Sequence, residues 1–237
     1  MTFPTRIPLR LAGALAAALL ALAPAAHAQT AVSNLGQSSG ATATIGTYDG
    51  GGEEWRRAFT FTTGSSASSF NFTGLTMTFN AASGSPGALT VALYSTFDPN
   101  TTAGGGSLLS TLSLSSGSPT SSGNSVFTGS ATLQPSTTYY LQFSSATAAA
   151  GNYYSYPVVG SGSEDAGGLP GWTIGNSAYE SNYNNTWTTL SGPGLFSVQA
   201  SAIPEPSTYA ALAGLGALGL ALWRRRVAAA RSMPAAS

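Results

Sequence analysis

The sequence predicts an all-β fold, a jelly-roll-like antiparallel β-sandwich, for residues 29–202. Apolar residues in this segment recur at every second position, which is the spacing of strands with one buried face. Clusters of Gly, Pro, Asn and Ser separate the runs, and no run has the period of an amphipathic helix. All aromatic residues except Phe3, Tyr209 and Trp223 lie here, so the segment should fold rather than form a disordered stalk.

Each predicted strand follows from a short alternating run. The predicted strands are 55–63, 70–80, 89–93, 108–114, 124–133, 139–143 and 195–202. In the second strand Phe70 and Phe72 share one face, whereas Leu75 and the apolar residues after it would lie on the other. One extra residue at Thr73-Gly74 restores the register, so we predict a β-bulge there.

The N-terminus predicts a signal peptide over residues 1–28. Arg6 and Arg10 precede an apolar run, and the small residues Ala26 and Ala28 stand where a signal peptidase cuts. Cleavage after Ala28 would remove the only histidine of the chain, and the sequence contains no cysteine. The exported domain must therefore be held by burial rather than by disulfides.

The charges of residues 29–202 are sparse and acidic. Arg56 and Arg57 are the only cations in this segment, against seven acids, which gives a side-chain charge of −5. The acids are Asp49, Glu53, Glu54, Asp98, Glu164, Asp165 and Glu180. Nucleic-acid binding needs a basic patch, so a nucleic-acid partner is excluded.

Composition also restricts the chemistry. Without histidine or cysteine, the exported chain has no Ser-His-Asp or Cys-His nucleophile system and no zinc or copper site of the usual ligands. A carboxylate pair acting on a glycosidic bond stays open, but no spacing among the acids selects one. We therefore predict a protein that is not an enzyme.

Two acidic loops raise the alternative of calcium as a cofactor. Residues 49–54 and the pair Glu164-Asp165 offer carboxylate oxygens in flexible surroundings, which hard cations prefer. No calcium-loop motif is present, and ordinary solvated loop charges explain the same residues.

Aromatic residues over 152–187 suggest a glycan-binding surface. The segment is rich in Tyr, Trp and Asn and lacks regular alternation, so we predict that it forms loops. Rings on loops beside amide side chains can stack on sugars and hydrogen-bond to them. The candidates are Trp172, Tyr179, Tyr183 and Trp187. The alternative is that the two Trp side chains cap the core.

The C-terminal segment 203–226 has three parts. Pro204, Glu205 and Pro206 form a rigid polar tripeptide, and a run of apolar residues and glycines leads from it to Trp223. Arg224, Arg225 and Arg226 follow as a cationic stop. We predict a single short transmembrane helix with the arginines and the tail 227–237 in the cytoplasm.

In that order the three parts resemble the PEP-CTERM sorting signal of Gram-negative bacteria. The resemblance implies export by the Sec machinery, transient anchoring in the inner membrane and processing by exosortase near Pro204-Glu205-Pro206. It also implies a place at the cell surface or in the exopolysaccharide matrix, with a structural, adhesive or binding role. The competing expectation is a carbohydrate-active protein, either a lectin or a carboxylate-based glycosidase acting on that exopolysaccharide.

The exported domain resembles the choice-of-anchor extracellular β-domains. This second resemblance rests on the order of four segments, which are 34–37, 58–64, 89–94 and 135–141. It implies a secreted sandwich and brings no catalytic residue with it.

Overall fold

The protein is described as a computed structural model. It describes residues 27–47, 54–66, 68–96, 106–146, 149–160, 164–181, 186–190, 192–203 and 206–231. His27–Ile203 is one compact unit, and the C-terminal helix is not part of it. Residues 1–26, which hold most of the predicted signal peptide including Ala26, lie outside the described residues. Ala28 is exposed and directly precedes the first strand.

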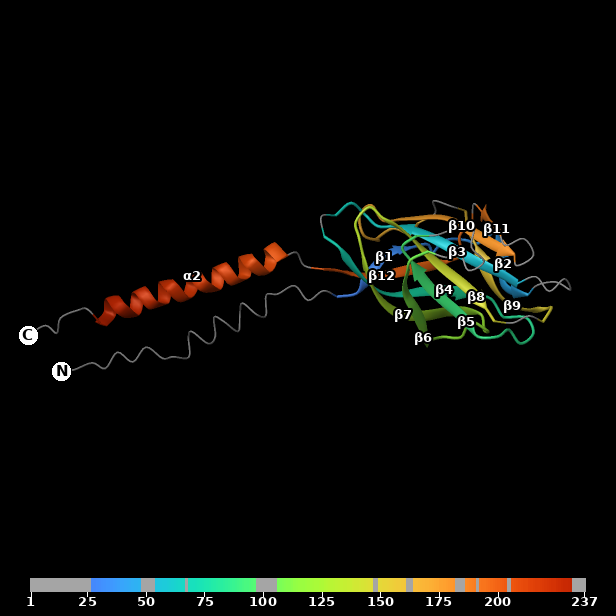
Figure 1. Ribbon diagram of the computed structural model, residues 1–237, viewed down its shortest axis with the longest axis horizontal. Helices are drawn as coiled ribbons and strands as arrows, with labels where there is room; N and C mark the ends of the chain where they lie inside the picture. Colours follow the sequence, from blue (N-terminus) through green and yellow to red (C-terminus); the bar gives the residue numbers. More distant parts are fainter. Residues whose placement is uncertain are drawn as a thin grey trace, which may run out of the picture. The chain divides into compact units, whose positions relative to one another are not determined.

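The described part of the compact unit forms twelve strands (Figure 1). They are β1 Gln29–Ser33, β2 Ala41–Thr47, β3 Glu54–Thr62, β4 Phe70–Phe79, β5 Leu89–Tyr94, β6 Leu108–Ser116, β7 Gly123–Leu133, β8 Thr138–Ser145, β9 Asn152–Val158, β10 Thr173–Ser181, β11 Thr186–Leu190 and β12 Phe196–Ala202.

The strands join into one curled antiparallel sheet with the order β1-β12-β4-β7-β6-β5-β8-β3-β10-β11. Strand β2 pairs with β3 and with β9 beside this path. The all-β, antiparallel part of the prediction is confirmed, but a sandwich of two separate sheets is not. The reason lies in β6, where Leu112 pairs with Val91 of β5 and Leu114 pairs with Phe127 of β7. This one strand makes the sheet continuous.

Aromatic side chains from distant parts of the sheet meet in the core. Phe59 of β3 stacks on Phe196 of β12 with ring centroids 5.8 Å apart, and it also contacts Phe143 and Tyr156. All four rings are almost completely buried. Such contacts add to the burial of apolar area, which here stabilises a domain without disulfides.

The bulge predicted in β4 is confirmed. The register with β7 shifts between Phe72 and Gly74, and the register of β12 against β4 shifts at the same level. The shift lets Phe72 and Leu75, which a regular strand would place on opposite faces, both point into the core with no exposed surface.

The prediction of loops is wrong for half of the segment 152–187, which β9, β10 and the start of β11 occupy. In β9 the inward residues Tyr154 and Tyr156 alternate with the outward Tyr153, so aromatic residues stand on both faces and hide the period. In β10 the register shifts between Ile174 and Ser177, which interrupts the alternation. Strands β1 and β2 also went unpredicted.

Outside the compact unit, the helix α2 runs over Pro206–Arg231 and has 26 residues. No helix in the described part of the chain is both long enough and apolar enough to cross a membrane. The prediction of a transmembrane helix within 203–226 is therefore corrected: Gly214, Gly216 and Gly219 dilute the apolar run, and Arg224 ends it.

The bulge gives a test of the packing around β4. In Gly74→Ala the new Cβ would lie 2.8 Å from the carbonyl oxygen of Phe127 on β7, so one strand must shift. We expect the free energy of unfolding to fall by about 1 to 3 kcal/mol, measured by denaturant unfolding. Gly40→Ala is the matched control, because no atom lies within 4 Å of its added Cβ. Equal stability of the two variants would contradict the close approach of β4 and β7.

Candidate functional site

Three of the four predicted glycan-binding residues lie in the described structure. Trp172 is 6% exposed and Trp187 of β11 is 8% exposed. The Trp172 ring stacks on Phe61 at 5.9 Å and meets Phe70 edge-on at 5.0 Å, between ring centroids. This burial agrees with the alternative that Trp172 caps the core, since Trp172 belongs to the core cluster. Trp187 is buried elsewhere, because it pairs with Glu180 on the face of the sheet that carries Arg56. Tyr183 lies outside the described residues.

Tyr179 belongs to a cluster that the sequence did not predict. Its ring stacks on Trp55 of β3 at 5.1 Å, and the guanidinium carbon of Arg57 lies 5.2 Å from both ring centroids. Arg57 is 5% exposed and donates from Nε to the carbonyl oxygen of Thr44 at 2.8 Å. The cluster is a buried cation held by two ring faces and a carbonyl.

The environment of Arg57 affects its proton affinity. Burial lowers the pKa of its guanidinium, while the nearby hydroxyls of Tyr156 and Tyr179 act in the opposite direction. Burial in turn raises the pKa of Tyr156 to about 12, against a smaller lowering by Arg57. Tyr156 is therefore neutral at physiological pH, and Arg57 keeps its charge because a guanidinium does not deprotonate in proteins. A signal for the buried arginine was present, since alternation in β3 puts Arg57 on the face of Phe59 and Phe61.

The neighbouring Arg56 points to the opposite face of β3. Its Nη1 lies 3.5 Å from Oε2 of Glu180, which pairs with it in register on β10 and has no exposed surface. The two adjacent arginines thus have separate environments, one inside the core and one on the outer face of the sheet.

The carboxylates of the acidic pair bind donors of the domain itself. Asp165 accepts hydrogen bonds from the hydroxyl of Ser33 at 2.7 Å, from the N–H of Gly36 at 2.9 Å and from Nε2 of Gln37 at 2.9 Å. Burial acts to raise the pKa of the Asp165 carboxyl, whereas the three hydrogen bonds lower it. The hydrogen bonds together outweigh burial, so the pKa lies below its ordinary value. Glu164 Oε1 accepts from the N–H of Ile174 at 2.8 Å. The pair therefore fastens its loop to β1, the turn after it and β10.

These contacts also bear on the calcium alternative. Among the described residues, no group of three or more His, Cys, Asp or Glu side chains could hold a metal ion. The other acidic loop, at 49–54, falls almost entirely outside the described residues. Calcium binding there stays a prediction.

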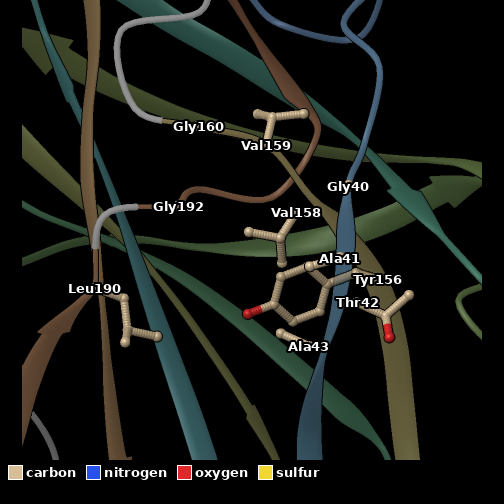
Figure 2. A pocket seen from close by; sticks show the side chains of 10 residues that line it. All are labelled: Gly40, Ala41, Thr42, Ala43, Tyr156, Val158, Val159, Gly160, Leu190 and Gly192. Carbon is tan, nitrogen blue, oxygen red and sulfur yellow. The ribbon is translucent and has the colours of Figure 1, made fainter.

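A surface pocket of about 450 Å³ opens beside β2 (Figure 2). Figure 2 shows the Tyr156 ring in it, with Ala41 and Ala43 of β2 to one side and Leu190 to the other. Its lining is Gly40, Ala41, Thr42, Ala43, Tyr156, Val158, Val159, Gly160, Leu190 and Gly192. No carboxylate lies among these ten residues, so this pocket offers apolar contact and two hydroxyl groups but no acid-base pair.

The C-terminal motif begins where the sheet ends. Strand β12 runs to Ala202, and the N–H of Ile203 still donates to the carbonyl oxygen of Ser69 at 3.0 Å. Pro204 and Glu205 lie outside the described residues, and Pro206 is the first residue of α2. The arginines at 224–226 are exposed on the helix.

The described chain is thus an all-β domain with the helix α2 after it in sequence, and α2 carries three consecutive arginines in its C-terminal half. The family model of the PEP-CTERM protein-sorting motif matches residues 202–226, and this match supports the class of PEP-CTERM proteins. No curated protein and no solved structure matches the chain significantly. The resemblance of the domain to the choice-of-anchor β-domains stays a prediction.

The position of Trp172 predicts the result of its removal. Trp172→Ala would leave a cavity between Phe61 and Phe70, so we expect a loss of about 3 to 5 kcal/mol in the free energy of unfolding. Leu114→Ala serves as the control, because Leu114 is 48% exposed and should cost far less. A melting curve unchanged in Trp172→Ala would speak against the core role of this indole.

Proposed function

We propose that this chain is an exported exosortase substrate that becomes a structural or adhesive component of the cell surface or the exopolysaccharide matrix. The observation that carries the proposal is the PEP-CTERM match at residues 202–226, directly after the last strand. Export by the Sec machinery fits Arg6, Arg10 and the small residues Ala26 and Ala28 at the other end of the chain. The motif suggests sorting to the outside of the cell; the structural or adhesive role is our inference.

The described domain supports a role without catalysis. Two of its charged groups are occupied by internal contacts, since Arg57 binds two rings and a carbonyl and Asp165 binds three donors of neighbouring segments. The exported chain also lacks the histidine and cysteine on which most nucleophilic sites depend. A domain that uses its charges to fix its own loops suits a scaffold or an adhesin better than an enzyme.

Removal of the central acid of the motif tests the sorting. In the native protein we expect the secreted form to lack the residues after a cut near Pro204-Glu205-Pro206, measured by intact mass. In Glu205→Ala we expect the uncut chain to accumulate with the cells, because the recognition motif has lost its only charge. Glu53→Ala, an acid outside the motif, is the control and should be processed normally. A native secreted protein that keeps its full C-terminus would overturn the proposal.

The geometry before the motif limits how a processing enzyme can reach it. Ala202 pairs with Phe70 of β4, Ser201 pairs with Asn71, and Ile203 donates to Ser69. Cleavage sites in proteins concentrate where the backbone is exposed and free of hydrogen bonds. The residues directly before Pro204 do not meet that condition, so exosortase can engage them only when the end of β12 frays.

A longer connection should therefore speed processing. We expect insertion of Gly-Ser-Gly-Ser between Ile203 and Pro204 to raise the rate of C-terminal cleavage several-fold in a pulse-chase experiment, because the motif no longer depends on the end of β12. The same insertion between Ser232 and Met233 is the control. An unchanged rate would mean that access to the motif is not limiting, while leaving the outcome for Glu205→Ala unaffected.

A further inference from the structure

The outer face of β5, β8, β3 and β10 carries a row of small residues across four strands. Because side chains alternate between the two faces of a strand, the residues next to the core-facing Phe59, Leu141 and Phe143 lie on the opposite face of the sheet. Larger neighbours leave little of them exposed, at 1% for Ala58, 6% for Ala92 and 7% for Gln142. Cross-strand register places four of them in one line: Ala92, Gln142, Ala58 and Ala178. Three of the four are alanines, so this row is low and forms a floor.

Larger polar side chains stand on both sides of the floor. On one side are the register pairs Thr90 with Ser144, and Glu180 with Arg56. On the other side Tyr94 pairs with Tyr140, which pairs in turn with Thr60. The two walls are four residues apart along the strands, which at roughly 3.3 Å per residue is about 13 Å.

The floor and the walls enclose a hollow. A pocket of about 230 Å³ lies at the β5 end of the row, and its lining is Arg56, Thr90, Ala92, Tyr94, Gln142 and Ser144. Five of these six side chains carry a hydrogen-bonding group, and the sixth is the floor alanine. We call the row and its two walls the outer trench.

We propose that the outer trench binds a neutral, hydroxyl-rich polysaccharide chain lying across the strands. A tyrosine ring offers an apolar face for the C–H side of a sugar, and the hydroxyls of Thr90 and Ser144 can both donate and accept. The amide nitrogen of Gln142 adds a donor. The guanidinium of Arg56 presents a fork of donors, and Glu180 holds it at 3.5 Å. The inference concerns the domain alone and does not depend on the sorting proposed above.

The charge of the trench favours a neutral ligand. Arg56 is balanced by Glu180, and the whole segment 29–202 has a side-chain charge of −5, so a uronic-acid polymer or a phosphate would be repelled at long range. The pocket lining has no aliphatic side chain larger than the methyl group of Ala92, and the nearest exposed one by strand pairing is Leu108 of β6, beside Tyr94. These residues also differ from the buried Trp172 and Trp187, which present little surface to a sugar.

The test uses the exported chain from Gln29 onward in affinity gel electrophoresis. The probes are galactomannan, xyloglucan, dextran and hydroxyethylcellulose as neutral polymers, and alginate as the anionic one. We expect at least one neutral polymer to retard the protein and alginate to leave it unretarded. Retardation by none of the polymers, or by alginate alone, would overturn the proposal.

Two variants locate the binding. Tyr94→Ala and Arg56→Gln should each weaken binding about tenfold, since each removes a stacking face or a charged donor from the wall. Thr132→Ala, an exposed position on β7 away from the trench, should bind like the native protein. A melting curve is measured for every variant. Tyr94 is half-buried at the end of β5, so Tyr94→Ala should keep the fold. Arg56→Gln can lose stability, because it removes the ion-pair partner of Glu180. Native affinity in a folded Tyr94→Ala would contradict the assignment.

Discussion

The contact between Phe59 of β3 and Phe196 of β12 is the constraint on which the other features depend. The two strands lie far apart in the sheet order, so their rings can meet only if the sheet curls over the core. In the curled sheet, successive side chains of β3 point alternately into the core and to the outer face. Arg57 must enter the core beside Trp55 and Tyr179, while Arg56 and Ala58 must face outward, and the outer trench is built from that outward set.

Period-two spacing was enough to predict the class of the fold and most of its strands, because apolar and polar residues alternate along these strands. The bulge at Gly74 was legible for the same reason, since Phe72 and Leu75 both had to be inside. In β9 the method failed because Tyr153 and Tyr154 put aromatic rings on both faces. A sandwich is not confirmed because β6 pairs with both β5 and β7, and the alternation of residues in β6 does not reveal which strands it pairs with.

The candidate sites were less predictable than the fold, for a physical reason. In the sequence, a tryptophan that stacks on Phe61 looks the same as one that stacks on a sugar. Only the burial of Trp172 in the structure distinguishes the two roles. The outer trench depends on Ala92, Gln142 and Ala58, which are far apart in sequence and meet only through strand register. By contrast, the sorting motif is a short contiguous segment, so it could be predicted over 203–226, close to the 202–226 that the family model matches.

The position of β12 links completion of the fold to availability of the motif. Among the described strands, β1 pairs with β12 alone, and β12 lies between β1 and β4. The first described strand therefore has its only ladder partner among the described residues in the last one. Closure of the sheet needs residues up to Ile203, and the motif begins at the next residue. Pairing of β12 with β4 thus fixes the backbone up to Ile203, directly beside the first residue of the motif.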